Sequence, residues 1–473
     1  MRTFSIYTLG CKVNQYESRQ IGQFLEGLGL CGVKPGQKPD LCVINTCCVT
    51  AAASAKSRQY VQRAVKLNPA TVRVICGCLP AMNSREMTSS DGDNVHIVSS
   101  RDKLPAMLAR IVIGETPSIK PKSGVEIKDD GESSANCPKL PPLTRFAGHT
   151  RAFLKVQDGC DGTCSYCIIP KVRPNVQSKP INEAVAEARA LVAAGHKEIV
   201  VTGVNLGAYG RKTVRRSGNL EFRIKNEECE RYLAELLDRL GGVPELKRIR
   251  VSSLEPGDIN DKLLDVFCSH NNIMPHIHLS VQSGSDRILK RMCRQYDLAE
   301  LREKIALIKS QLDRPAITAD CIVGFPAETE EDFEQTVELA KWAGFSKIHV
   351  FAFSPREGTA AAKMKDRIQP KVVKHRAAIL RNLGDDLGRK FREQFIEEIC
   401  EVLIENTEPL SGRCERYFIV KVKSEKEKGK SDFGFGSPVS GQSSNSRGRR
   451  CASIVKVKIT AVTEDGAEGE VKS

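Results

Sequence analysis

The sequence predicts an α/β protein with three folded parts: an N-terminal Rossmann-like parallel-sheet domain, a central incomplete (β/α)6 barrel and a small C-terminal β domain. Three observations support this prediction. Short β-rich runs alternate with helical patterns in residues 1–112 and again in residues 152–356. A proline-rich stretch separates these two regions, and the residues after about 400 contain β-like runs without helical periodicity.

The N-terminal domain is predicted over residues 1–113. Its β-rich runs and helical patterns follow one another in a βαβ rhythm, which is typical of a parallel sheet. The runs lie at 4–9, 41–44 and 72–76, and the helical patterns lie near 17–28 and 51–65. Residues 114–148 then carry five prolines among Lys, Ser, Gly and Glu, a composition that predicts a linker.

The central barrel is predicted over residues 149–369. Six β-rich runs are expected near 153–157, 198–202, 247–252, 276–281, 317–323 and 347–353. Helical stretches separate them at 181–194, 232–240, 299–312 and 330–343. Six β/α units fit an incomplete parallel barrel, whose chemistry is expected at the carboxyl ends of the strands.

A helical segment over 370–399 leads into the last domain, 400–473, with β-like runs at 401–405, 417–422 and 454–461. Residues 424–450 are rich in Lys, Gly, Ser and Arg and are predicted to form a mobile surface insertion. Residues 411–460 hold twelve Lys or Arg against four Asp or Glu. Such a basic β module fits an RNA-binding surface, although a solvated tail would have the same charge.

Composition narrows the setting further. The 473 residues include 18 cysteines and carry a net charge of +14, which favours a polyanionic partner. The chain has no uninterrupted apolar run of membrane-spanning length, and its first residues lack the apolar core of a signal peptide. We therefore expect a cytoplasmic protein in which several cysteines serve metal or redox chemistry.

Cys160, Cys164 and Cys167 form a C-x3-C-x2-C run directly after the first strand of the barrel. A [4Fe-4S] cluster has four irons, so three thiolates leave one iron open to bind a substrate or cofactor. Zinc uses the same ligands but normally requires four, and no fourth Cys or His follows within a dozen residues. A disulfide with a spare thiol would suit a secreted protein. The spacing favours the cluster over zinc.

A second set of cysteines lies in the N-terminal domain. Cys11, Cys47 and Cys78 each lie just past the end of a predicted strand. The carboxyl ends of parallel strands share one edge of a sheet, so these three thiols are predicted to meet in a second metal site. Cys48 and Cys76 are competing candidates, but neighbours in an extended strand point to opposite faces, so only one of each close pair should fit.

These motifs together resemble the radical S-adenosylmethionine (SAM) methylthiotransferases. The resemblance is carried by Leu-Gly-Cys-Lys-Val-Asn-Gln-Tyr-Glu at 9–17, Asn-Thr-Cys at 45–47, Lys-Ser-Arg at 56–58, Gly-Cys at 77–78 and the loop at 160–167. Within the family, 10–17, 201–210 and 250–256 resemble the branch called MtaB. Members of that branch act on N6-threonylcarbamoyladenosine at tRNA position 37, and the family's C-terminal β domain is called TRAM.

The resemblance implies two [4Fe-4S] clusters and SAM as cofactors. Cys160, Cys164 and Cys167 would hold the cluster that cleaves SAM to a 5'-deoxyadenosyl radical. Cys11, Cys47 and Cys78 would hold the cluster that carries the sulfur to be inserted, and a second SAM would supply the methyl group. The implied partners are the tRNA anticodon loop and a low-potential electron donor such as flavodoxin or ferredoxin, with no membrane.

The resemblance also implies SAM contacts in the barrel. The backbone near Tyr166 would meet the adenine, and Ser253 with Glu255 would meet the amine or the ribose hydroxyls. The remaining contacts are assigned to the methionyl end and to the closing wall of the pocket: Thr202, Gly203, Asn205, Gln282, Ser283 and Gly324 with the backbone at 322–325.

Some positions depart from the family pattern. Pro174 replaces a usual glycine, Cys293 stands where a polar residue is more usual, and 424–450 is an insertion that could alter tRNA docking. Alternative functions are methylthiolation of isopentenyladenosine in tRNA or of a ribosomal-protein aspartate. A non-catalytic RNA-binding protein with structural zinc is an alternative of a different class.

Overall fold

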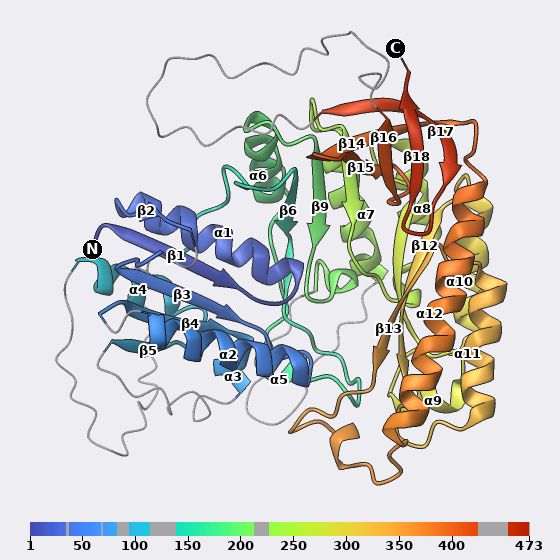
Figure 1. Ribbon diagram of the computed structural model, residues 1–473, viewed down its shortest axis with the longest axis horizontal. Coiled ribbons are helices and arrows are strands. Elements are labelled where there is room, and N and C mark those ends of the chain that lie inside the picture. Colours follow the sequence, from blue (N-terminus) through green and yellow to red (C-terminus); the bar gives the residue numbers. More distant parts are fainter. Residues whose placement is uncertain are drawn as a thin grey trace. The chain divides into compact units, whose positions relative to one another are not determined.

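The computed structural model describes residues 1–34, 37–67, 70–82, 94–113, 139–211, 227–423 and 453–472. The chain forms two compact units, whose elements Figure 1 colours by residue number. The first contains Met1–Leu143 with Cys167–Pro174, and the second contains Thr144–Tyr166 with Asn175–Ser473. Most of the predicted linker and the predicted insertion lie outside the described residues. Among the described helices, none is long and apolar enough to span a bilayer.

The first unit is built on a five-stranded parallel sheet with the order β2-β1-β3-β4-β5. β3 and β4 are the buried centre of the sheet, and their almost continuous apolar sequence is typical of a strand covered on both faces. The strands are β1 (Thr3–Thr8), β2 (Cys31–Gly32), β3 (Leu41–Thr46), β4 (Val72–Gly77) and β5 (Val95–Ile97).

Helices cover both faces of this sheet. α1 (Lys12–Gly27) and α4 (Leu104–Ile113) share one apolar cluster, and α2 (Ala51–Leu67) with α3 (Cys78–Met82) share another. The sequence predicted the first helix from about residue 17, whereas α1 begins at Lys12. The difference arises because Cys11, in an extended conformation, directly precedes the first turn and serves as the helix N-cap position.

The second unit contains the parallel strands of the barrel in two groups. One group has the order β10-β9-β6 and the other has the order β11-β12-β13. Two isolated bridges connect the groups. Ile249 of β10 pairs with Ile273 in the loop before β11, and Leu254 in the loop after β10 pairs with Leu279 of β11. The strands are β6 (Arg151–Lys155), β9 (Glu198–Thr202), β10 (Arg248–Val251), β11 (His276–Gln282), β12 (Ala316–Val323) and β13 (Lys347–Ala352).

Helices connect the barrel strands, as the predicted β/α alternation requires (Figure 1). α11 begins with a capping box, in which Thr329 and Asp332 exchange hydrogen bonds with the backbone, and it ends at Gly344 in the left-handed conformation. The helices of this unit are α6 (Ile181–Ala193), α7 (Glu227–Gly241), α8 (Asp261–Ser269), α9 (Asp286–Arg291), α10 (Leu298–Gln311), α11 (Glu330–Ala343) and α12 (Pro370–Glu393). A short strand pair, β7 (Gln157–Asp158) and β8 (Gln177–Ser178), flanks the cysteine loop, and α5 (Ile169–Val172) belongs to the first unit.

The chain ends in a small closed β-barrel with the order β14-β15-β16-β18-β17. Its strands are β14 (Ile399–Thr407), β15 (Leu410–Cys414), β16 (Ile419–Lys423), β17 (Ile454–Val462) and β18 (Ala467–Val471). Alternate residues of these strands fill its core. The predicted fold class is therefore confirmed in all three of its parts: a parallel-sheet domain, a central strand–helix barrel and a small C-terminal β domain.

Two buried arginines join the central strands to this small barrel. Arg248 donates to the carbonyls of Glu401 and Arg413 at 2.6 and 3.0 Å. Arg250 donates to the carbonyl of Cys414 at 2.7 Å and to the carboxylate of Glu198 at 2.9 Å. Since both arginine side chains are at most 1% exposed, these bonds replace the water that the guanidinium groups lose.

Replacing Arg250 with alanine should lower the free energy of unfolding of the second unit by about 3–5 kcal/mol, because Glu198 would keep a buried charge with one partner fewer. Arg389→Ala is the matched control, since its ion pair with Asp386 is exposed and should be worth less than about 1 kcal/mol. Chemical denaturation of both variants measures the difference. Equal denaturation midpoints for the two variants would show that Arg250 does not stabilise the second unit.

Candidate active site

The cysteine site of the first unit lies where three neighbouring strands end. Cys11 follows β1 and precedes α1, Cys47 follows β3, and Cys78 is the first residue of α3 directly after β4. Because β1, β3 and β4 are adjacent parallel strands, these residues share the carboxyl edge of the sheet. The sequence made the same prediction from strand ends alone.

Two local features hold the loops together. The φ of Gly10 is +104°, and a Cβ added there would lie 2.8 Å from the Cβ of Cys47, so only glycine allows this close approach. The side-chain amide of Asn14 donates to the carbonyls of Leu9 and Thr46 at 2.8 and 2.9 Å. Asn14 thereby ties the loop that carries Cys11 to the strand end that carries Cys47.

The thiols of this site influence one another electrostatically. Burial is the main cause that raises the pKa of Cys47 to about 11, and the nearby Cys78 and Cys11 act in the same direction. Burial also raises the pKa of Cys11. A metal ion would remove this penalty because it replaces the protons and compensates the negative charge of the thiolates. The donor set therefore fits a metal cluster.

The two competing cysteines of this unit occupy different places. Cys76 belongs to the apolar cluster on the other face of the sheet, together with Val43 and Val74. Cys48 is fully buried beside Cys78, and a hydrogen bond from its thiol lowers the pKa of Cys78. Cys48 is thus the competing thiol that lies next to the three assigned ones.

A buried charge network lies beside this site and was not found by sequence reasoning. Arg173 forms two hydrogen bonds of 2.9 Å with the carboxylate of Glu17 and one of 3.3 Å with Asn14. Arg101 donates to the Sγ of Cys78 at 3.4 Å. The guanidinium groups place positive charge next to thiols that would carry negative charge with a metal bound. The paired residues are far apart in the sequence, so no local sequence pattern could have predicted these contacts.

The cysteine loop of the second unit begins at Gly159. Its φ is +78°, and an added Cβ would lie 1.8 Å from the carbonyl oxygen of Asn175, so the turn into the loop requires glycine. The amide of Gly162 donates to the Sγ of Cys160 at 3.3 Å. Cys160 and Cys164 belong to the second unit, whereas Cys167 begins the segment assigned to the first unit.

Arg294 organises the side chains around this loop. Its Nη1 donates to the Sγ of Cys164 at 3.0 Å, and its Nη2 lies 3.1 Å from the carboxylate of Glu255. Burial raises the pKa of Cys160 to about 11, and negative charge on Cys164 and Glu255 acts in the same direction. Cys160 and Cys164 would therefore be thiolates more readily with a cation bound, which fits ligands of an iron–sulfur cluster. The sequence analysis did not single out Arg294.

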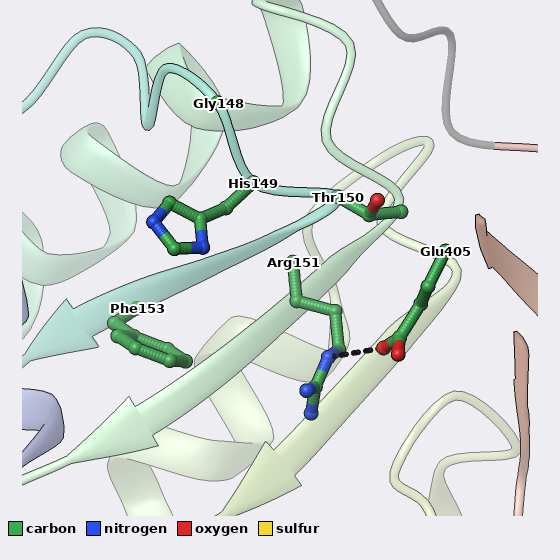
Figure 2. A pocket seen from close by; sticks show the side chains of 6 residues that line it. All are labelled: Gly148, His149, Thr150, Arg151, Phe153 and Glu405. Carbon is green, nitrogen blue, oxygen red and sulfur yellow. Dashed lines mark ion pairs between the residues drawn. The ribbon is translucent and has the colours of Figure 1, made fainter. Parts of the chain in front are cut away.

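Residues of the second unit at the amino end of β6 also line a cavity. Its volume is about 190 Å³. Figure 2 shows the residues that line it: Gly148, His149, Thr150, Arg151, Phe153 and Glu405. The ion pair between Arg151 and Glu405, at 2.7 Å, lies across it. Since β6 begins at Arg151, this cavity is at the amino end of the strand, opposite to the end where barrel chemistry is expected.

Comparison with known proteins places the chain in a family. Residues 154–340 match the radical SAM superfamily, and residues 3–99 match the uncharacterized protein family UPF0004. The threonylcarbamoyladenosine tRNA methylthiotransferase MtaB of Bacillus subtilis is 35% identical over 86% of this chain and 85% of its own length. The chain belongs to the radical SAM methylthiotransferase family.

Other relatives support the assignment of this chain to the methylthiotransferase family. The MtaB protein of Rickettsia prowazekii is 36% identical over 85% of this chain and 87% of its own length. A tRNA-2-methylthio-N(6)-dimethylallyladenosine synthase of Bacillus licheniformis is 31% identical over 90% and 81%. The radical SAM methyltransferase TsrM of Kitasatospora setae has a TM-score of 0.51 at 12% identity, over 74% and 73%, which supports the fold alone.

The predicted SAM contacts of the methylthiotransferase occupy two kinds of environment. Asn205 and Glu255 lie near the thiols, since the amide nitrogen of Asn205 is 3.9 Å from the Sγ of Cys160. Thr202 is buried at the end of β9, and a Cβ added to Gly203 would lie 2.9 Å from Gln157. Ser253 is partly buried in the loop after β10.

The remaining contacts are held by structural hydrogen bonds or packing. Ser283 is buried, and its hydroxyl lies 3.4 Å from that of Thr336. Gln282 has a φ of +65°, and Gly324 has a φ of +74° with its amide donating to Glu328 at 2.8 Å. Tyr166 packs against an apolar cluster that includes Met292 and Phe325. These assignments stay predictions.

The unusual cysteine at 293 occupies a special backbone position. Its φ is +56°, in the left-handed region where glycine and asparagine are more common. The thiol is exposed, and the next residue is Arg294.

Proposed function

We propose that this chain adds a methylthio group to C2 of N6-threonylcarbamoyladenosine at tRNA position 37, using SAM as both radical source and methyl donor. The observation that carries the proposal is the 35% identity with a threonylcarbamoyladenosine tRNA methylthiotransferase over 86% of the chain. The two family matches, at residues 3–99 and 154–340, contain both sets of cysteines. Two tRNA-2-methylthio-N(6)-dimethylallyladenosine synthases are less similar to this chain, at 30–31% identity.

The chain's residues have separate roles in this proposal. Cys160, Cys164 and Cys167 would hold the [4Fe-4S] cluster that, when bound, supplies the electron for reductive cleavage of SAM. The first unit would hold a second [4Fe-4S] cluster through Cys11, Cys47 and Cys78. Each set has three thiols, so each leaves one iron open for a ligand that is not a protein side chain.

Three side chains near Cys160 and Cys164 would support binding and charge balance. Arg294 would compensate the negative charge of the sulfur ligands, because it already donates to Cys164. It also holds the carboxylate of Glu255 at 3.1 Å, and this carboxylate would accept from the SAM amine or from ribose hydroxyls. Asn205 is held by its backbone amide, which donates to Gln157 at 2.8 Å.

The proposed partners are tRNA and a low-potential electron donor such as flavodoxin or ferredoxin. Arg248 and Arg250 bond the C-terminal barrel to the central strands, so deleting this barrel would also expose buried charges. Point changes on its surface are therefore a cleaner test of RNA binding. Lys421 and Lys456 are exposed on β16 and β17 and are the residues we choose.

Replacing both Lys421 and Lys456 with alanine should weaken tRNA binding and reduce the dependence of log Kd on log salt by up to about two. Each lysine that contacts a phosphate contributes about one to that slope, because it releases a counterion. The control is Lys341→Ala on α11 with an exposed side chain. Unchanged affinity and slope would show that this face of the barrel does not bind tRNA.

The decisive experiment is mass spectrometry of tRNA nucleosides from cells with and without the gene. Loss of the 2-methylthio form of threonylcarbamoyladenosine on deletion, with restoration by the wild-type gene, is the expected result. Loss of the 2-methylthio isopentenyl form would instead favour the sister reaction. An unchanged profile in cells without a redundant enzyme would overturn the proposal and leave the ribosomal-protein and zinc alternatives.

A further inference from the structure

Three strands of the second unit bring two histidines and an aspartate together. His278 lies on β11, Asp320 on β12 and His349 on β13. Asp320 is the direct register partner of His349, and His278 is the partner of Thr318 on the same strand as Asp320. The three residues therefore occupy adjacent positions on one face of a parallel sheet.

That face is the one turned away from the helices. A Cβ added to Gly384 of α12 would lie 3.2 Å from the Cβ of Ile348, so Ile348 faces that helix. Its neighbour His349 points to the opposite face, because successive side chains of a strand alternate. On β12, Ala319 and Cys321 are buried, whereas Asp320 between them is partly exposed. The histidines and the aspartate thus line the inner side of the strands.

The distances suit a common ligand. The Nε2 of His278 is 3.2 Å from the Oδ2 of Asp320, and one ligand atom from each of the three residues lies within 4.8 Å of the others. The rings of His278 and His349 meet edge to face with centroids 5.5 Å apart. A tetrahedral zinc ion with bonds of about 2.0–2.1 Å would bring its ligand atoms to about 3.4 Å from one another. The ligand atoms of the three residues would therefore have to move closer by at most about 1.4 Å.

Thr318 prepares His278 for such a role. Its hydroxyl oxygen lies 2.7 Å from the Nδ1 of His278, and it is also 3.3 Å from the Nε2 of His276. When Nδ1–H donates to Thr318, the proton is fixed on Nδ1 and the lone pair of Nε2 points to Asp320. Metal-binding histidines are commonly oriented by such a second hydrogen bond.

We propose that His278, Asp320 and His349 bind one divalent first-row transition-metal ion of the class represented by zinc. Zinc and iron both bind to two imidazole nitrogens and one carboxylate. Which of the two metals occupies such a site depends more on the supply of each metal than on the ligand types. Three protein ligands leave at least one coordination position for water or another oxygen ligand on the inner side of the barrel strands. With the ion bound, His278 and Asp320 would each contact the metal, and their direct contact would be lost.

The test uses the enzyme with its iron–sulfur sites reconstituted, so that the cysteines are occupied. After loosely bound metal has been removed, zinc is titrated against a chromogenic chelator in the absence of tRNA and SAM. We expect one zinc site in the wild type and at least about tenfold weaker zinc binding in His349→Gln and Asp320→Asn. His270→Gln is the matched control, since its ring lies 2.8 Å from Asp238. This control should bind zinc as the wild type does.

Anomalous diffraction on both sides of the zinc absorption edge locates the ion independently of affinity. A zinc peak between the three side chains is expected, and circular dichroism shows whether each variant remains folded. Equal zinc affinity in His349→Gln and the wild type, or a zinc peak at other residues only, would overturn the proposal and leave His278 with Asp320 as an ion pair. Because neither tRNA nor SAM is present, this outcome is independent of the proposed methylthiolation.

Discussion

Replacing Cys164 with alanine is expected to abolish reductive cleavage of SAM. An iron of the cluster would lose its protein ligand, and Arg294 would lose the sulfur to which it donates at 3.0 Å. Changes in groups that only support metal ligands already cost about 10–100-fold, so loss of a ligand should reduce turnover by more than about 100-fold. The measurement is 5'-deoxyadenosine formed from SAM with a chemical reductant under anaerobic conditions.

Cys268→Ser is the matched control for this change. Cys268 is an exposed thiol on α8, and its Sγ lies 3.5 Å from the carbonyl of Gln311, so it has no part in the proposed cluster. This variant should form deoxyadenosine at the wild-type rate. Cys164→Ser serves as a second test that changes one atom of the side chain. Normal deoxyadenosine formation by both Cys164 variants would refute the assignment.

Replacing Cys47 with alanine is expected to separate the two halves of the reaction. SAM cleavage should continue, because Cys160 and Cys164 are untouched, whereas methylthiolation of tRNA should stop. Cys47 lies against Gly10 in the first unit. The thiols that act on it electrostatically there are those of Cys11 and Cys78. The iron content should fall by about four atoms per chain, the content of one cluster. Iron analysis, deoxyadenosine and modified tRNA are measured on the same preparation.

Two further cysteine variants make this result specific. Cys76→Ala changes a buried thiol on the other face of the same sheet and should keep both iron content and methylthiolation. Cys48→Ala removes the thiol that hydrogen-bonds to Cys78, so it tests the one competing ligand inside the site. Loss of about four iron atoms per chain in Cys48→Ala, with normal iron content in Cys47→Ala, would exchange the two assignments.

The sequence was sufficient to predict the fold class because hydrophobic period is a local property. The alternation of β-rich and helical patterns gave the parallel-sheet domain, the barrel strands and the C-terminal β domain. The start of α1 was placed about five residues late, because its first turn follows a loop with no conventional capping residue. Helix ends depend on such local hydrogen bonds more than on the apolar pattern.

The sequence by itself determined which cysteines are candidate ligands, since thiolate chemistry and short spacings such as that of Cys160 and Cys164 are written in the chain. Only the tertiary structure decided which distant residues support them: Arg294 beside Cys164, and Arg173 with Glu17 beside the other site. It also brought His278, Asp320 and His349 together. The physical reason is that strand register sets the distances among the last three residues, whereas the packing of loops and helices sets the distances of the arginines. Neither leaves a trace in local composition or periodicity.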